Sequence, residues 1–456
     1  MKNIRREKLR YGIVVFLILS AACFFTESPM QAKDTAEYIA MYAYLPPLYP
    51  LFLRLLRILF GDAAFMYAAV FIQTIFAAWI VVYLSELLCD TFQTKRFIKF
   101  IIYMFLVLTY FKVDEHHPGC NLWILTEGLS YSLFYVFVYY SIIFLKEKTG
   151  MAFAKLSVAA AALMLCRTQF IVCFGMLVLY VVYLILKKEV QIKKAFYLAA
   201  GIVSGLIMVY AVQAGYEKIA DKTNVNMFNL SSVGTHFYYY ATAEDASRIE
   251  EESERQLFLD ICEEIAEDGY SYKGKEESWQ EGVSSYHNSV PAIRGVVSNR
   301  ITEYVQQMGI QDELMADEIA AQILDRQMKA MYPHFWQWAW DALKQFPVSM
   351  ISMAAFYPGE GRWRALRGLF MAYSAVVYSL YIAVNIALFV KKKRLQIENV
   401  FCIILMVFTV VNIIATEMMI RVIVRYFTYS FGLFYISGLL ALLALFRNRD
   451  EVRVET

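Results

Sequence analysis

The chain has 456 residues, of which 59% are hydrophobic, 16% aromatic and 18% charged. This balance excludes an ordinary soluble globular domain and indicates a chain embedded in lipid. The formal net charge of +2 gives no sign of nucleic-acid binding or of a strongly charged substrate.

Ten apolar, nearly uncharged runs approach the length of roughly 20 residues that a helix needs to cross a bilayer core. The sequence therefore predicts an all-α polytopic membrane protein with about ten transmembrane helices. The runs are 11–27, 63–88, 97–112, 122–145, 151–166, 169–186, 195–214, 367–390, 398–419 and 422–446. Only Arg167 and Thr168 separate the fifth run from the sixth, which leaves a tight helical hairpin, which we favour, or a re-entrant feature.

Most of the basic residues that flank these runs fall on one side. Lysine and arginine favour short cytoplasmic loops, so this side is predicted to be cytoplasmic, together with both termini. The flanking residues include Lys2, Arg5, Lys95, Arg96, Lys146, Lys148, Lys187, Lys188, Lys391, Lys392, Arg447 and Arg449. The first segment has an alternative as a cleaved signal peptide, because a basic start, the apolar run Gly12–Phe25 and the small Ala32 fit that template.

The spans divide the chain into three parts. Residues 1–214 form a membrane module of about seven spans with a first external loop at 28–61, and residues 367–456 form a second module of about three spans. Between them, 215–366 is expected to be a mainly helical extracytoplasmic domain. Apolar spacing predicts helices over 248–268 and 312–331, the second ended by Pro333, and a loop around 269–289.

An aromatic segment, 334–346, closes the middle part. It contains Phe335, Trp336, Trp338 and Trp340, and two interpretations stay open. A helix of this composition rests in the membrane interface or packs in a protein core.

The first external loop carries two acidic residues, Asp34 and Glu37, three positions apart. In a helix both carboxylates would share one face, and a partly desolvated carboxylate can abstract a proton from a hydroxyl. The alternative is a pair of ordinary acids in a solvated loop. Pro46, Pro47 and Pro50 predict a rigid, extended entry into a short surface helix over 51–60.

A second polar cluster, Asp114-Glu115-His116-His117, lies in another external loop. Adjacent histidines invite a metal site, but no further spaced ligands are evident, so a divalent metal is not favoured. The acids Asp114 and Glu115 could instead be a second catalytic or acceptor-binding group, or form a plain solvated loop.

Three arginines lie at predicted outer ends of spans, against the positive-inside trend: Arg167, Arg421 and Arg425. An unpaired arginine is costly there, and its forked donors suit a phosphate group. The alternative is structural pairing with Glu127 or Glu417.

Short motifs recur at the predicted outer ends. They are Asp34 shortly before Tyr38, Pro46-Pro47-Leu48-Tyr49-Pro50-Leu51, Leu59-Phe60-Gly61, Leu125-Thr126-Glu127, Cys166-Arg167-Thr168 and Arg425-Tyr426. Together they resemble the GT-C fold glycosyltransferases that use polyprenyl-phosphate sugars, in the branch of the protein O-mannosyltransferases and bacterial lipid A aminoarabinose transferases. The resemblance covers most of the membrane portion, whereas 215–366 matches in position alone.

This resemblance implies an inverting transfer of a sugar from a lipid phosphate to a glycan, lipid or protein acceptor outside a bacterial plasma membrane. Asp34 matches the general base, while Glu37 stands in for an acid that family members often have directly beside it. By the same resemblance Arg167, Arg421, Arg425 and Tyr426 would bind the donor phosphate, and Glu127, like Asp114 and Glu115, would be an acceptor-binding or second acid. No cofactor or nucleic-acid partner is implied.

Three other functions remain open from the residues. A transporter or flippase of lipid-linked saccharides usually has internal repeats and mid-membrane acids, whereas this sequence shows no repeat and almost no mid-span acids. A polysaccharide polymerase or ligase would share the outer site but not the proline pattern, and a non-catalytic assembly factor would tolerate the displaced Glu37.

Overall fold

A computed structural model describes residues 2–21, 23, 28–112, 119–221, 234–272, 279–355, 366–420, 426 and 428–447. Within these ranges the fold is all-α, with seventeen α-helices and no sheet. Two isolated β-bridges join Met30 to Trp123 and Tyr42 to Asp221. The predicted all-α fold class is therefore confirmed.

Seven helical segments are long and apolar enough to cross a membrane. They are α4 (Phe65–Phe92), α6 (Thr126–Glu147), α8 with its preceding 3-10 turn (Thr168–Leu186), α9 (Lys193–Tyr216), α16 (Gly368–Lys392), α17 (Ile397–Met418) and α18 (Thr428–Phe446). The chain is thus an integral membrane protein by length and hydropathy.

The three remaining predicted spans are also helices, but they are shorter or more charged. They are α1 (Lys2–Ala21), α5 (Arg96–Phe111) and α7 (Gly150–Cys166). Helix α1 packs on α4, α5 packs on α18 and α4, and α7 packs on α6 and α9. Arg167, in an extended conformation, and the 3-10 turn η3 (Thr168–Phe170) separate α7 from α8 (Ile171–Leu186), and the two helices contact each other, as expected for a hairpin.

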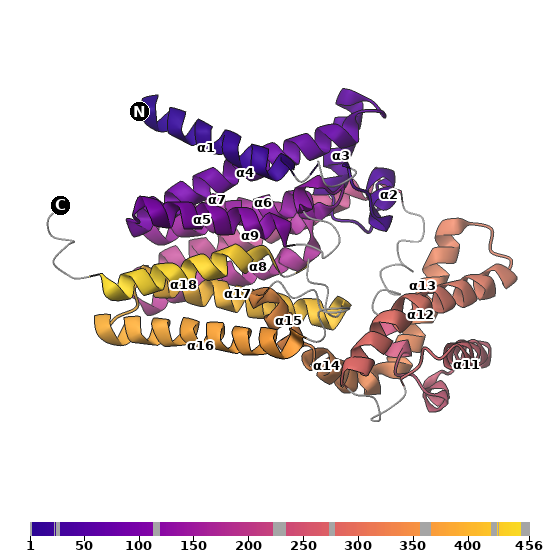
Figure 1. Cartoon of the computed structure of the whole chain (residues 1–456). Coiled ribbons are helices and arrows are strands. Elements are labelled where there is room, and N and C mark those ends of the chain that lie inside the picture. Colours follow the sequence, from indigo (N-terminus) through magenta and orange to yellow (C-terminus); the bar gives the residue numbers. More distant parts are fainter. Residues whose placement is uncertain are drawn as a thin grey trace.

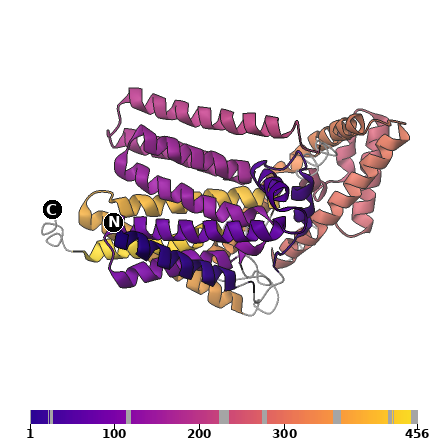
Figure 2. The same ribbon diagram turned by 90° about the horizontal axis from the view of Figure 1, so that it is seen from above.

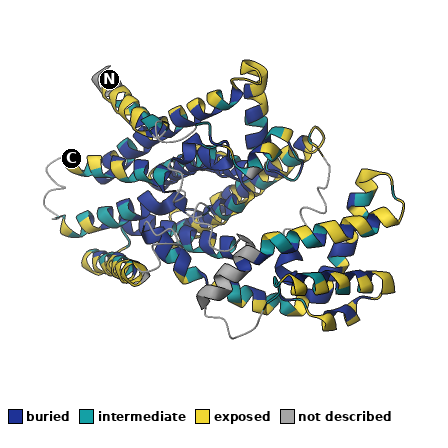
Figure 3. Ribbon diagram, turned by 45° about the vertical axis from the view of Figure 1, so that its right-hand side comes forward, coloured by how far each residue is buried: buried dark blue, intermediate teal, exposed yellow. Residues whose placement is uncertain are grey.

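The ten helices form one bundle, the membrane body, in which α6 is the most buried of the seven candidate spans (Figure 1). Helices α9 and α16 lie at its edge and are largely exposed, which is the position of a lipid-facing helix (Figure 3). One close crossing requires glycine: a Cβ at Gly432 of α18 would stand 2.2 Å from the Phe105 carbonyl oxygen of α5. Small residues permit this kind of close helix packing in membranes.

A separate group of helices, residues 234–343, forms a head domain with its own apolar core. It comprises η4 (Ala243–Arg248), α11 (Glu252–Glu267), α12 (Trp279–Gln307), α13 (Glu313–Met331), η5 (Tyr332–His334) and α14 (Phe335–Leu343). The predicted helices 248–268 and 312–331 correspond to α11 and α13, with the predicted inward residues Leu257, Ile261 and Ile323 buried.

One prediction in this region needs correction. The loop expected over 269–289 is wrong from Trp279 onward, because α12 begins there and buries Ile293 and Val297 in the head-domain core. Helix α14 of the head domain packs on α17, and α15 (Phe346–Ala354) packs on α16 and α17. In the aromatic segment Trp338 is buried, whereas Trp336 and Trp340 are exposed.

The first external segment contains two helices, α2 (Lys33–Ala40) and α3 (Leu48–Phe60). The extended entry predicted from the prolines is wrong at Pro47, whose ψ of −26° is helical, and at Pro50, which lies inside α3. Proline fits the first turn of a helix because the backbone N–H there has no helical partner.

The membrane body and the head domain lie at opposite ends of an elongated molecule (Figure 1). The start of α1 and the end of α18 are at the end of the bundle away from the head domain in both ribbon views (Figures 1 and 2). Helix α2 lies at the head-domain end of the bundle (Figure 1).

Candidate functional site

Helix α2 is fixed to the membrane body at both ends. Before it, the Met30 N–H donates to the Leu122 carbonyl and the Met30 carbonyl accepts from the Ile124 N–H, both in the α5–α6 loop, and Thr35 donates to the Ile124 carbonyl at 3.0 Å. After it, Met41 closes the helix in a left-handed conformation, and its carbonyl accepts a hydrogen bond from the N–H of Asp221, five residues beyond the end of α9. The face that carries Asp34 and Glu37 is therefore held in place.

A buried ion pair lies beneath this helix. Arg167, directly after α7, contacts Glu127 in the first turn of α6, with 2.9 Å between Nη1 and Oε1. Both side chains are nearly inaccessible, at 8% and 4% exposure. The Arg167 guanidinium also stacks 4.2 Å from the centre of the Tyr426 ring. The sequence left two roles open for Arg167, phosphate binding and pairing with Glu127, and the structure contains the pairing.

Tyr38 connects α2 to this ion pair. Its ring packs edge-on against Tyr49, with 5.3 Å between ring centres. Burial and the Glu127 carboxylate raise the pKa of the Tyr38 phenol, while Arg167 and a hydrogen bond with Thr126 act against them. The phenol therefore stays protonated near neutral pH, next to both Glu127 and Arg167.

A second cluster of polar and charged side chains surrounds Glu37 on the side of the head domain, and consists of Asp34, Tyr44 and Arg294. Burial raises the pKa of the Glu37 carboxyl, and the neighbouring Asp34 acts in the same sense. A hydrogen bond with Tyr44 and the charge of Arg294 lower the Glu37 pKa in turn. All four side chains are partly buried. Arg294 belongs to α12, so the head domain places a cation beside the two carboxylates of α2.

The described site thus has two layers around α2. Asp34 and Glu37 face Arg294 of the head domain, and Tyr38 faces the buried pair of Arg167 and Glu127. The helical prediction that put the two carboxylates on one face is confirmed. Such an arrangement can accept a proton from a hydroxyl and hold an anionic group near a cation.

Several predicted site residues lie outside the described ranges: Asp114, Glu115, Arg421 and Arg425. Tyr426, the residue after Arg425, is described, and its carbonyl accepts hydrogen bonds from Gln169 and Asn412 at 3.0 and 2.8 Å. Among the described residues there is no cluster of three His, Cys, Asp or Glu side chains able to hold a metal ion.

Sequence reasoning missed two cations. Arg294 was not among the predicted site residues, because it lies in a polar stretch of α12 that contains no recognisable motif. Lys112, at the end of α5, is buried and donates from Nζ to the carbonyls of Met353 and Ala355 at 2.9 and 2.6 Å, and to that of Ser352. It therefore caps α15 and lies 4.0 Å from the Phe431 ring centre. In the sequence, Lys112 is recognisable only as a single lysine at the end of an apolar run.

Comparison of the chain with protein-family models, with curated proteins and with solved structures finds no match.

Proposed function

We propose that this protein is a membrane glycosyltransferase of GT-C type, with about ten spans and the head domain outside the cell. It would move a sugar from a polyprenyl-phosphate carrier to a glycan, lipid or protein acceptor on the outer face of a bacterial plasma membrane. The observation that carries the proposal is the pair of partly buried carboxylates on α2, between a cation of the head domain and the buried ion pair of the membrane body.

In the proposed reaction Asp34 accepts the proton of the acceptor hydroxyl. The acceptor oxygen forms a bond to the anomeric carbon while the bond from that carbon to the phosphate oxygen breaks, and its electron pair leaves with the lipid phosphate. Attack from the face opposite the phosphate inverts the anomeric centre. Arg421 and Arg425 are proposed to bind the phosphate, since Arg167 is already paired with Glu127.

The roles of the neighbouring residues follow from their contacts. Glu37, with its raised pKa, would assist Asp34 or bind a second acceptor hydroxyl. Tyr38 keeps its proton and would donate a hydrogen bond at the floor of the site. Glu127 and Arg167 would fix Tyr38 and Tyr426 in position. Asp114 and Glu115 are kept as candidate acceptor-binding acids.

A transporter would need ionisable groups near the middle of the bilayer. Within the described spans the buried acids Glu127, Glu398 and Glu417 all lie within four residues of a helix end. This distribution favours chemistry at a membrane face over passage through the bundle.

The test is mass spectrometry of envelope glycans, lipids and glycoproteins from cells with and without the gene. A sugar modification that disappears with the gene should return with the wild-type protein and with Glu263→Gln, which alters an exposed acid of α11. It should not return with Asp34→Asn, although that variant should reach the membrane in normal amounts. Full restoration by Asp34→Asn would refute the assigned base, and an unchanged glycan profile on deletion would refute the transferase.

A further inference from the structure

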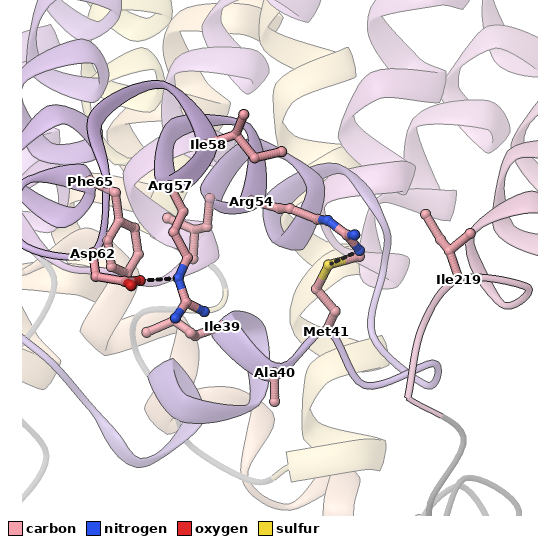
Figure 4. A pocket seen from close by; sticks show the side chains of 11 residues that line it. Ile39, Ala40, Met41, Arg54, Arg57, Ile58, Asp62, Phe65 and Ile219 are labelled. Atoms are coloured by element: carbon pink, nitrogen blue, oxygen red, sulfur yellow. Dashed lines mark hydrogen bonds and ion pairs between the residues drawn. The ribbon is translucent and has the colours of Figure 1, made fainter.

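A cavity of about 510 Å³ opens at the C-terminal end of α2 (Figure 4). Its walls are the end of α2, one face of α3, the turn into α4, and Ile219 just after α9. Neither Asp34 nor Glu37 is among the residues that line it. The cavity is therefore separate from the carboxylate pair.

Two arginines of α3, Arg54 and Arg57, reach into this cavity (Figure 4). Arg57 pairs with Asp62 in an exposed contact. Arg54 has a soft partner, the Met41 sulfur, at 3.3 Å, and within the described residues no carboxylate lies within ion-pair distance of it. The residues that line the cavity therefore include two arginines but one acid, Asp62. Arg54, which has no acidic partner among the described residues, is exposed.

The outer surface of α3 next to these arginines is apolar. Leu55, Ile58, Leu59 and Phe60 are 54%, 73%, 64% and 52% exposed, while Leu53 and Leu56 on the opposite face are buried against the body. An exposed apolar strip beside basic residues is the pattern of a helix lying in the headgroup region of a bilayer. Since α3 leads directly into the long apolar α4, the strip lies at the level where α4 enters the membrane.

We infer that this cavity binds the phosphate of an anionic glycerophospholipid, with its acyl chains against the apolar strip of α3. The forked donors of Arg54 and Arg57 match the phosphate oxygens. The adjoining strip of Leu55, Ile58, Leu59 and Phe60 gives the chains an apolar surface that a free anion would not use. Because Ile39, Ala40 and Met41 of the α2 end form one wall, the bound lipid would also support the helix that carries Asp34. The inference does not depend on the proposed transferase activity.

The test uses the full-length protein in nanodiscs or detergent and counts bound lipids by native mass spectrometry. Wild type should retain phosphatidylglycerol over phosphatidylcholine. The double variant Arg54→Gln/Arg57→Gln should bind phosphatidylglycerol about tenfold more weakly, the order expected for losing charge-assisted hydrogen bonds. Arg300→Gln, an exposed arginine of the head domain, serves as the matched control and should not change lipid binding.

A third variant keeps the inference testable if the double variant folds poorly. Asp62→Asn removes the acid that competes for Arg57, so phosphatidylglycerol should bind as well as in wild type or more tightly. Weaker binding in Asp62→Asn, or unchanged binding in a folded double variant, would overturn the inference. Displacement of phosphatidylglycerol by millimolar inorganic phosphate would also overturn it, since that result would identify a site for free anions.

Discussion

The pair formed by Arg167 and Glu127 is the most buried ion pair among the described residues, and its energetics are asymmetric. Removing one partner leaves the other charge buried without compensation, which typically costs about 3–5 kcal/mol. Removing both charges leaves neutral groups whose burial is far less costly. We therefore expect Arg167→Gln and Glu127→Gln each to destabilise the protein strongly, and the double variant to be more stable than either single one.

Thermal unfolding of the four proteins in one detergent measures this double-mutant cycle. The exposed pair of Arg255 and Glu252 offers the comparison, because its cycle should give less than about 1 kcal/mol of coupling. Additive losses at Arg167 and Glu127 would mean that the two side chains do not depend on each other.

The pKa of Glu37 gives a prediction about pH. Burial and Asp34 raise this pKa, whereas Arg294 and the hydrogen bond with Tyr44 lower it. In Arg294→Gln one lowering influence is lost, so the Glu37 pKa rises further and the carboxylate form appears at higher pH. If transfer needs that carboxylate, the acid limb of its pH–rate profile should move upward by about one unit, the size usual for a nearby opposite charge.

The pH–rate profile of Arg294→Lys distinguishes an effect of the positive charge at position 294 from a purely structural role of the side chain. Lysine keeps the positive charge, so its acid limb should stay close to that of wild type. A general loss of rate at every pH in Arg294→Gln, with no displacement of the acid limb, would argue that Arg294 only holds α12 in place.

At the scale of single residues, the sequence predicted those features that depend on residues close together in the chain. The shared face of Asp34 and Glu37 follows from their spacing of three residues. The approach of Arg294 does not, because it comes from another domain, more than 250 residues away in the chain. For the same reason the pairing of Arg167 with Glu127 could be named as an alternative but not chosen.

At the scale of single elements, the short helix η4 depends on one buried acid. Asp245, 3% exposed, accepts hydrogen bonds from the backbone and side chain of Thr242 at 2.9 and 3.1 Å, and contacts His334 at 2.8 Å and Arg248. Burial alone would raise its pKa, but these partners outweigh burial and lower it. Asp245 therefore joins η4 to η5 through a carboxylate that must be ionised.

A lowered carboxyl pKa fixes the sign of the pH dependence. The folded state binds the proton less well than the unfolded state, so the stabilisation is present at neutral pH and is lost as pH falls through the folded pKa. We expect Asp245→Asn to weaken the head domain by about 1–3 kcal/mol at pH 7. The difference from wild type should shrink toward pH 3.

Hydrogen exchange of peptides covering 243–267, compared between wild type and variant at each pH, measures this effect. Glu263→Gln on the exposed face of α11 should leave exchange unchanged. A gap between Asp245→Asn and wild type that is constant from pH 7 to pH 3 would contradict the assigned cause.

The elements that the sequence predicted well are those whose own apolar spacing decides them. Helices α11 and α13 have such spacing, and α13 begins where Asp312 caps it by accepting from Leu314 and Met315. The start of α12 has weak amphipathic spacing and many turn-forming residues, and burial of Tyr286, together with Ile293 and Val297 further along the helix, outweighs that local preference. At Pro50 the error is the reverse, because the sequence predicted extended backbone where α3 is helical. Proline in the first turn of a helix does not disrupt the helix.

At the scale of the whole molecule, hydropathy and charge predicted the membrane body, whereas the cation that the head domain places beside α2, Arg294, had no signal in the sequence. The start of α1 and the end of α18 share one end of the bundle, and the head domain occupies the other (Figure 1). The basic residues that flank the spans gather at the end bearing the termini, which favours the cytoplasm for that end.

Helix α1 decides whether the number of spans is even. It packs along α4, buries Val15 and Leu19 in the core of the body, and brings Glu7 to 3.8 Å from Lys99. Removing α1 as a signal peptide would expose this surface of α4 to lipid and leave Lys99 with Glu86 alone as its acidic partner. We therefore expect α1 to be retained as a span.

Reporters fused to each terminus, together with a cysteine placed at the exposed position 263, measure the topology. Both fusions should report the cytoplasm, and Glu263→Cys should react with an impermeant maleimide added to intact cells, since the head domain is expected outside. A parallel cysteine at the exposed Lys187, predicted cytoplasmic, should be protected until the membrane is opened. Loss of an N-terminal tag from the mature protein would show that α1 is cleaved, and termini on opposite sides would require an odd number of spans, so that one of the short helices α5 or α7 would not cross the bilayer.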